Sequence, residues 1–289
     1  MRISEGNYNA QVMQAALAIK KNVQNYRFVL LCGPSASGKT TTAHKLKHRL
    51  EEVGIGARVI SMDDFFLGPE HYPKLPDGKL DLESIECVDL SLLNQCFIQL
   101  LRNRETWLPE YNFAEQSRVL EANHISFNEN EILIMEGIHA LNPRVLSDIP
   151  LENKFRLYVS VRTRFLEGDD IAMEPSDIRL TRRLVRDYKF RGYSPLKTLE
   201  QWQHVRAGER ANIYPYRDDV DLKMDNTIDY EICVWHELLQ TLLDCGAQET
   251  YRDHPELQNI LKGLERFASM DYRLIPRDSL LREFIGTSI

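Results

Sequence analysis

The stretch Phe28-Val-Leu-Leu-Cys-Gly-Pro-Ser-Ala-Ser-Gly-Lys-Thr40 decides the fold of this 289-residue chain. Its first five residues are apolar and predict a buried strand, and the residues from about 39 to 53 follow a helical pattern. Between the two, residues 33–40 fit the GxxxxGK[ST] pattern in full. The glycines let successive backbone N–H groups point inward as an anion-binding nest, and the helix start adds its partial positive charge. The stretch therefore predicts a cradle for the phosphates of a nucleotide.

The cradle also indicates which groups would bind ATP and Mg²⁺. Lys39 would reach the β- and γ-phosphates, and the Thr40 hydroxyl would ligate Mg²⁺. Glu136 ends the apolar run 132–135, where a carboxylate can orient the metal or its water; without the cradle it would be taken for a surface residue. The residues of the cradle that we expect to bind the nucleotide are Gly33, Ser35, Ala36, Ser37, Gly38, Lys39, Thr40 and Thr41.

Short apolar runs alternate with amphipathic stretches along the first 230 residues. The pattern predicts strands and helices at 28–32, 39–53, 57–61, 89–102, 132–135 and 155–161. Because the strand runs are continuously apolar, both faces should be covered, as in a parallel sheet. The predicted fold class is α/β, with a doubly wound, mainly parallel sheet of the P-loop NTPase type flanked by helices.

Three parts are expected along the chain. An N-terminal helical segment at 1–24 precedes a P-loop domain at 25–248, and an extension at 249–289, helical at its start, packs on that domain. Residues 67–83 are rich in proline and glycine and predict an irregular excursion, a class of segment that often serves as a lid or binding loop.

A pair of aspartates provides a candidate base. Asp63 and Asp64 follow the strand at 57–61, at the edge where α/β sheets bind ligands. A carboxylate there can take the proton of an attacking hydroxyl, as phosphoryl transfer to an alcohol requires. Standing alone, the same pair would be interpreted as turn or helix-cap residues.

Residues 179–191 carry six basic side chains and one acid. On a helix, Arg179, Arg182, Arg183 and Arg186 share one face, and like charges at i,i+4 repel by about 0.2–0.5 kcal/mol per pair. We expect nucleotide phosphates to offset this repulsion, so that the segment forms an arginine-rich helical lid hinged at Gly192. The alternatives are a solvated basic face or a nucleic-acid patch, and the second is disfavoured because no aromatic platform interleaves the arginines.

Composition limits the partners and the compartment. The net charge of −7 disfavours a nucleic-acid binder, and no apolar run approaches the roughly 18 residues that read as a membrane span. Five cysteines without a CxxC pair fit reduced thiols better than a disulfide framework. We therefore expect a cytoplasmic protein that binds neither nucleic acid nor membrane.

The sequence resembles the uridine kinase / phosphoribulokinase family of P-loop kinases. The resemblance covers about residues 25–240 and rests on the cradle, Ser61-Met-Asp-Asp-Phe-Phe66, Pro109-Glu-Tyr-Asn-Phe113, Glu136-Gly-Ile138 and the lid at 179–192. A closer likeness is to the kinase domain of bacterial nucleoside kinases. It is carried by Glu136-Gly-Ile-His-Ala-Leu-Asn-Pro143, Val185-Arg-Asp-Tyr-Lys-Phe-Arg-Gly192, Asn212-Ile-Tyr-Pro-Tyr216 and Leu280-Leu-Arg-Glu-Phe-Ile-Gly286. In those proteins the domain often follows a threonyl-tRNA-synthetase-like part, which we expect to be absent here.

The resemblance implies roles for the matching positions. Asp63 matches the family's catalytic base for a 5′-hydroxyl, and Glu136 matches its magnesium-linked acid. Lid residues matching phosphate-holding positions are Arg183, Arg186 and Arg191; Lys39, Arg183 and Arg186 would assist Asp63, and Arg183 would also contact the acceptor. Tyr111 and Phe113 match positions that flank the nucleobase, although their alternation by itself fits core packing. Family members also form dimers or tetramers, so a homo-oligomer is implied.

Three positions depart from the family pattern. The ribose-binding aspartate falls at Glu83, one methylene longer but still able to accept from a diol. The histidine that reads the pyrimidine falls at Gln116, and a further lid arginine falls at Tyr193. These changes keep the kinase chemistry but weaken the indication of uracil or cytosine as the base.

Together these features predict an ATP- and Mg²⁺-dependent kinase that phosphorylates the 5′-hydroxyl of a nucleoside. The alternatives are a kinase for another small hydroxyl acceptor, such as a sugar phosphate, a pantothenate-like molecule or a polyol, and a non-catalytic ATP-binding regulator.

Overall fold

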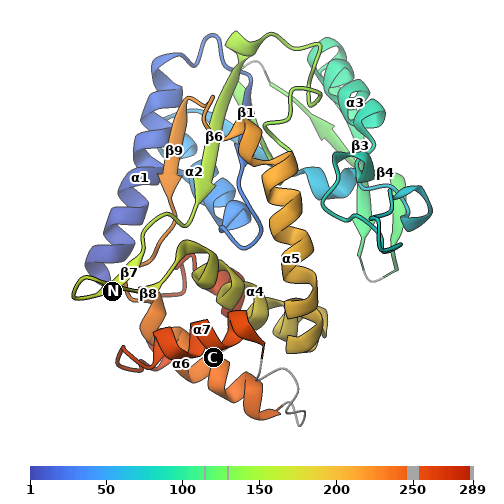
Figure 1. The fold of residues 1–289 in the computed structure, drawn as a ribbon. Helices are drawn as coiled ribbons and strands as arrows, with labels where there is room; N and C mark the ends of the chain where they lie inside the picture. The colour runs from blue at the N-terminus through green and yellow to red at the C-terminus, as the bar shows by residue number, and fades with distance from the viewer. Residues whose placement is uncertain (114, 129, 246–253, 287–289) are drawn as a thin grey trace.

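A five-stranded parallel sheet forms the centre of the molecule in a computed structural model that describes residues 1–113, 115–128, 130–245 and 254–286 (Figure 1). The order of the strands is β2-β5-β1-β6-β9, and each strand is parallel to its neighbours. Their bounds are β1 Phe28–Cys32, β2 Gly56–Ser61, β5 Glu131–Glu136, β6 Lys154–Ser160 and β9 Leu222–Asp225. The predicted doubly wound α/β class is confirmed.

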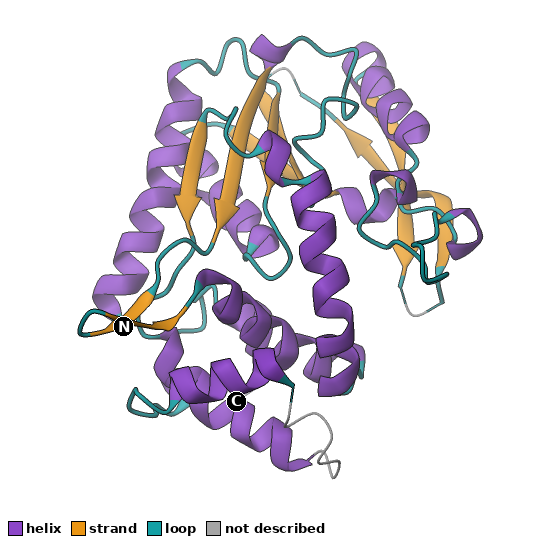
Figure 2. Cartoon of the chain, viewed as in Figure 1, coloured by secondary structure: helices purple, strands orange, loops and turns teal. Residues whose placement is uncertain are grey.

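Both faces of the sheet are covered, as the continuous apolar strands predict. In β1, Val29 and Leu31 belong to one buried cluster, whereas Phe28 and Leu30 belong to the other. Figure 2 shows the orange sheet between purple helices. The first cluster takes side chains from α1 Arg2–Lys21, α2 Lys39–Glu52, α6 Glu231–Cys245 and α7 Pro255–Leu264. The second takes them from α3 Leu90–Asn103.

Two antiparallel hairpins lie outside the central sheet. Strands β3 Glu105–Asn112 and β4 Ser117–Ser126 form the larger one, and β7 Phe165–Glu167 and β8 Asp170–Met173 form the smaller one. Neither hairpin lies within the strands expected at 28–32, 57–61, 132–135 and 155–161. Most of β4 is exposed, so it lacks the apolar run that reveals a central strand.

The lid region is a pair of helices, α4 Pro175–Arg191 and α5 Pro195–Asn212. Gly192 ends α4 with a left-handed φ of 64°, which fits a glycine at this position. The excursion at 67–83 contains a 3₁₀ turn at Pro69–His71 and an isolated bridge between Lys74 and Leu80.

Both ends of the described chain pack against α2. In α1, the Tyr8 hydroxyl lies 2.9 Å from Thr42 Oγ1. Near the other end, α7 and the short helix α8 Arg282–Ile285 bury Leu257, Leu264 and Phe284 in the same cluster. Of the tail at 250–289, residues 250–253 and 287–289 lie outside the described residues, and the three-part division remains a prediction. None of the described helices is long and apolar enough to cross a membrane.

Candidate active site

The cradle follows β1 and opens α2, as the sequence predicts. A Cβ at Gly33 would lie 2.1 Å from the Val159 carbonyl oxygen of β6, so the loop passes too close for a larger residue. Gly38 has a φ of +83°, a conformation that favours glycine. Lys39 donates from Nζ to the Pro34 carbonyl at 3.2 Å, and the buried Ser37 hydroxyl has no hydrogen-bond partner among the described residues. The loop thus has the shape and the spare donors of a phosphate cradle.

The two predicted metal residues, Thr40 in the first turn of α2 and Glu136 at the end of β5, meet in the structure. Thr40 Oγ1 donates to Glu136 Oε1 at 2.9 Å. Burial raises the pKa of Glu136 to about 7, with Asp63 adding to the rise, while Lys39 and the Thr40 hydroxyl oppose it. A hydroxyl and a carboxylate are hard oxygen ligands of the kind that Mg²⁺ prefers, and a bound cation would favour the ionised form of Glu136.

Asp63 lies in the 3₁₀ turn Met62–Phe65 directly after β2, and its N–H donates to Ser61 Oγ at 3.2 Å. Burial raises the pKa of Asp63, and three cations, Lys39, Arg191 and Arg186 in order of effect, lower it. The cradle, which carries Lys39, and the end of α4, which carries Arg186 and Arg191, therefore both act on this carboxylate although they are more than a hundred residues apart in sequence.

The adjacent Asp64 has a different environment. Its carboxylate accepts a hydrogen bond from the backbone of Tyr111, and burial raises its pKa to about 6. Asp64 is therefore directed at the β3–β4 hairpin, and Asp63 is the better candidate for the base.

Two arginines of the stripe are structural. Arg179 pairs with Glu209 of α5 at 2.5 and 2.8 Å, and Arg182 pairs with Glu231 at 2.7 Å, all with buried side chains. We expected nucleotide phosphates to offset the repulsion along the stripe. That expectation overlooked these carboxylates, because they come from helices that are distant in sequence.

The other three lid arginines gather around Asp187, the one acid of the stripe. Its buried carboxylate lies 3.2 Å from Arg183 Nε, 3.1 Å from Arg186 Nη2 and 3.3 Å from Arg191 Nη1. Arg183 also donates to Ser35 Oγ at 2.8 Å. One acid thus holds all three predicted phosphate-binding arginines beside the cradle. No role was expected for Asp187 from the sequence.

Tyr193, which stands where the family has a further lid arginine, lies just beyond the end of α4. Lys197 Nζ lies 3.5 Å from the centre of its ring. A cation is therefore present at this position, although it comes from α5.

Glu83 reaches the same region from the end of the excursion. Burial raises its pKa to about 7, and the nearby Arg183 and Lys39 oppose the rise. Asn212 of α5 donates to the Glu83 carbonyl at 2.9 Å and fixes the backbone there. Glu83 therefore faces the cradle side of the lid, where an acceptor diol would have to lie.

Aromatic rings form a cluster next to Asp64. Tyr111 is buried, its hydroxyl lies 3.2 Å from that of Tyr72, and its ring centre is 4.9 Å from that of Phe113 in an edge-on arrangement. Phe113 is 60% exposed and offers a free face. Gln116 is exposed in the turn of the hairpin with a φ of 52°. The structure thus brings Tyr111 and Phe113 together and leaves Gln116 at the tip of the hairpin.

His139 is a site residue to which sequence analysis assigned no chemistry. It is 2% exposed, and its ring lies near the backbone of Ser84. Burial lowers its pKa to about 4, and Lys39 adds to the effect, so the imidazole is neutral. The sequence feature that could have indicated a site role for His139 is its position in the loop after β5, two residues beyond Glu136-Gly137.

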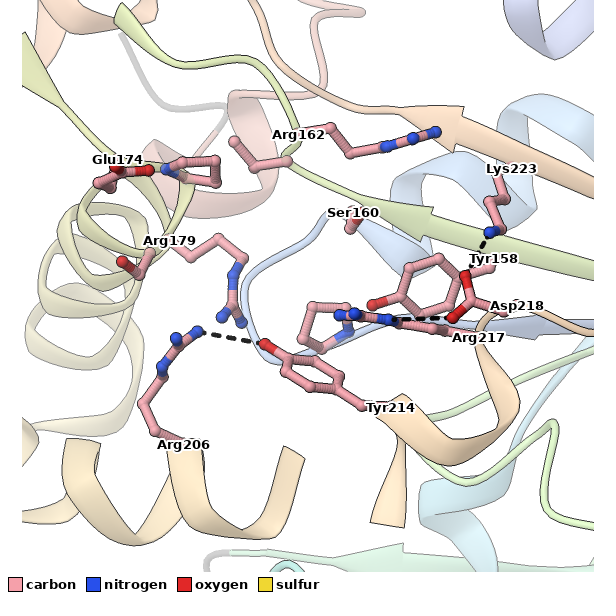
Figure 3. Close-up of a pocket in the computed structure, with 14 residues that line it drawn as sticks. Tyr158, Ser160, Arg162, Glu174, Arg179, Arg206, Tyr214, Arg217, Asp218 and Lys223 are labelled. Atoms are coloured by element: carbon pink, nitrogen blue, oxygen red, sulfur yellow. Dashed lines mark hydrogen bonds and ion pairs between the residues drawn. The ribbon is translucent and has the colours of Figure 1, made fainter. Parts of the chain in front are cut away.

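A cavity of about 430 Å³ lies on the other side of the cradle, beside Pro34 (Figure 3). Arg179 and Arg206 point into it, with Arg206 lying 3.3 Å from the Tyr214 hydroxyl. Arg217 and Lys223 are both paired with Asp218. Of the residues expected to meet phosphates, only Arg179 lines this cavity, and it is paired with Glu209. Arg206, Arg217 and Lys223 are also held by acids of the fold, whereas the Arg162 guanidinium has no ion pair among the described residues.

Comparisons with known proteins point to the same family. The model of the Phosphoribulokinase / Uridine kinase family matches residues 28–232. A uridine kinase of Schizosaccharomyces pombe is 33% identical over 178 residues, covering 61% of this chain and 35% of that protein. A uridine kinase of Tolumonas auensis is 32% identical over 60% of this chain and 73% of that protein.

A solved structure described as a possible uridine kinase from Bacillus stearothermophilus shares the fold. Its TM-score is 0.51 at 17% identity, over 78% of this chain and 100% of that one. The chain spans about a third of the length of the Schizosaccharomyces pombe protein and of a Saccharomyces cerevisiae uridine kinase that is 29% identical over 59% of this chain. The family match covers β1 to the start of α6, including the cradle, Asp63, Glu136 and the lid, and the chain belongs to the phosphoribulokinase / uridine kinase family.

Proposed function

We propose that the chain is an ATP- and Mg²⁺-dependent kinase that transfers the γ-phosphoryl group to the 5′-hydroxyl of a nucleoside. One observation carries the proposal: Lys39, Arg186 and Arg191 all act on the Asp63 carboxylate. The hydrogen-bonded pair of Thr40 and Glu136 belongs to the same site. A base, cations for the transferring phosphoryl group and a metal site then share one point at the edge of the sheet.

Each group has a defined task in this reaction. Asp63 takes the proton of the acceptor hydroxyl as its oxygen attacks the γ-phosphorus, and the bond from that phosphorus to the β-bridging oxygen breaks to release ADP. The raised pKa of Asp63 favours this proton transfer. Lys39, Arg183, Arg186 and Arg191 would neutralise the phosphates. Thr40 and Glu136 would hold Mg²⁺, which would supply positive charge to the phosphates.

A neutral, diol-bearing acceptor fits the surroundings of Glu83. The Glu83 carboxylate can accept from vicinal hydroxyls, and the Tyr111–Phe113 pair offers a face for a planar base. A sugar phosphate would need free cations in the excursion. Of the three basic residues in the excursion, Lys79 and His71 are exposed and paired with Asp77 and Glu70. Lys74 is exposed and has no ion pair among the described residues. One cation is a weak basis for binding a phosphate, which favours the nucleoside.

The decisive test measures coupled ADP production over a panel of nucleosides, sugar phosphates, pantothenate and polyols. Nucleosides should stimulate ADP release, and Asp63→Asn should lower the rate by about 10²–10⁴-fold. Asp64→Asn is the matched control, with less than a tenfold loss. Full activity of Asp63→Asn would place the base elsewhere. A basal rate over the whole panel would favour the regulator instead.

Two further expectations remain proposals. The described cysteines Cys32, Cys87, Cys96 and Cys233 are free thiols, which supports a cytoplasmic location. A homo-oligomer is implied by the family resemblance, and size-exclusion chromatography with light scattering would test it.

A further inference from the structure

The segment formed by residues 276–286, which we name the C-terminal strap, lies across both the cradle and the lid helix. Leu280 packs against Gly38, where a Cβ would lie 2.7 Å from Leu280 Cδ1. Arg182 of α4 lies 5.2 Å from the centre of the Phe284 ring, and Lys189 donates to the Ile285 carbonyl at 3.2 Å. The strap thus touches the two elements that would enclose a nucleotide.

One side chain of the strap occupies a donor of the cradle. The N–H of Thr41, in the first turn of α2, donates to Glu283 Oε2 at 3.0 Å. The first amides of a helix have no partner within the helix, and in a GxxxxGK[ST] loop such amides hold nucleotide phosphates. Glu283 therefore uses a hydrogen bond that a phosphate oxygen would otherwise make.

The charge of Glu283 acts on the same place. It adds to the rise in the pKa of Glu136, so its field extends to the metal pair. An anion at the start of α2 is stabilised by the helix dipole, as a phosphate would be. Two anions competing for one amide also repel each other, so bound nucleotide and bound Glu283 oppose one another.

We infer that Glu283 is an internal competitor of the nucleotide. Its carboxylate accepts the hydrogen bond of the Thr41 amide and must leave that amide when phosphates bind. The inference rests on the proposed function only in taking a nucleotide as the ligand of the cradle. The apparent affinity for nucleotide then equals the intrinsic affinity multiplied by the fraction of molecules in which Glu283 has left the Thr41 amide.

The exchange requires only a side-chain rotation. Leu280, Leu281 and Phe284 are fully buried, and Arg282 donates to the Ile275, Pro276 and Gly286 carbonyls, so the strap backbone is firmly held. Glu283 itself is only partly buried. The strap can therefore remain as a wall of the site while its carboxylate moves away.

Isothermal titration calorimetry with ADP and with MgATP tests the inference on the full chain. Glu283→Ala removes the competing acceptor, and Glu283→Gln removes its charge while keeping its shape. We expect ADP to bind about five- to tenfold more tightly to Glu283→Ala, with a smaller gain for Glu283→Gln, because a hydrogen bond to a charged group is lost from the empty state. Asp278→Asn, a change at a 78% exposed carboxylate of the same strap, should leave the Kd within twofold.

The outcomes separate this inference from the proposed function. Unchanged or weaker nucleotide binding by both Glu283 variants, with melting temperatures like that of the parent, would overturn the competition. Absence of nucleotide binding in all proteins would overturn it as well. Tighter binding without phosphorylation of any nucleoside would uphold the competition and refute the nucleoside kinase.

Discussion

The phosphate half and the acceptor half of the site are built in different ways. On the phosphate side, Lys39, Thr40, Glu136 and the Asp187-held arginines make short polar contacts with one another or with the loop. On the acceptor side, Phe113 is largely exposed and Gln116 lies at a hairpin tip. The groups proposed for phosphoryl transfer are thus held in place by contacts within the fold, whereas the proposed acceptor surface has exposed faces that a ligand would have to cover.

The largest effect is expected from a change at Asp187, which holds the arginines of the phosphate half. Asp187→Asn leaves three arginines beside a buried, uncharged group, and breaking a buried ion pair costs about 3 kcal/mol or more. At about 2–4 °C per kcal/mol, thermal unfolding should shift down by at least about 6 °C, and the KM for ATP should rise. The exposed Glu200→Gln in α5 is the control. A melting temperature unchanged by Asp187→Asn would show that the arginines are held by something else.

The next test separates activity from stability at the metal pair. Glu136→Gln should lower kcat by about 100-fold, because the metal loses its carboxylate. In the parent protein, the pKa of Glu136 in the folded state is about 7, above the ordinary 4.5, so the folded state binds the Glu136 proton more tightly than the unfolded state does. The resulting stability is present below pH 4.5 and lost as the pH rises through 7. The variant should therefore melt higher than the parent at pH 8 and similarly at pH 5.

Two readings check this interpretation of Glu136. Glu131→Gln, at the opposite end of β5, should change neither kcat nor its pH dependence. A Glu136→Gln protein that melts lower than the parent at pH 8 would contradict a buried acid whose charged form is disfavoured.

On the acceptor half, Glu83→Gln should raise the KM of the nucleoside by about tenfold and spare the KM for ATP. With a pKa of about 7, Glu83 gains its charge between pH 6 and 8, so the acceptor KM of the parent should fall over this range. The variant should lose that slope. Glu86→Gln, which alters an exposed partner of Arg144, is the control, and an equal slope in both variants would remove Glu83 from the acceptor site.

The smallest effect is expected at Phe113. Phe113→Ala should raise the acceptor KM about three- to tenfold, the value of one stacking contact, with kcat and melting temperature nearly unchanged. Trp107→Ala, at the far end of the hairpin and 48% exposed, should do nothing to the KM. If Phe113→Ala instead lowers the melting temperature by several degrees, the ring is part of the core and the two halves are less different than they appear.

What could be predicted from the sequence follows the same division. The cradle is encoded locally, because a strand, a glycine loop and a helix follow one another within about 25 residues. The parallel sheet and the place of Glu136 are likewise marked by short, continuous apolar runs. The partners Glu209 and Glu231 of the buried arginines come from α5 and α6. No local pattern couples such residues. The β4 strand, mostly exposed, lacks the apolar period on which strand prediction depends.

Packing of both described ends on α2 has a consequence for how the molecule comes apart. The Tyr8 hydroxyl of α1 hydrogen-bonds Thr42. From the strap, Leu280 packs on Gly38, and Glu283 accepts the hydrogen bond of the Thr41 amide. The first turns of α2, which follow the cradle, are therefore held by both ends of the described chain, while His44 and His48 lie on the exposed face of the helix. Release of either end should disorder the phosphate loop at once, so unfolding is expected to be cooperative across the chain. Partly opened forms should have lost the ability to bind nucleotide, and a saturating nucleotide should protect both ends against proteolysis as strongly as it protects the centre.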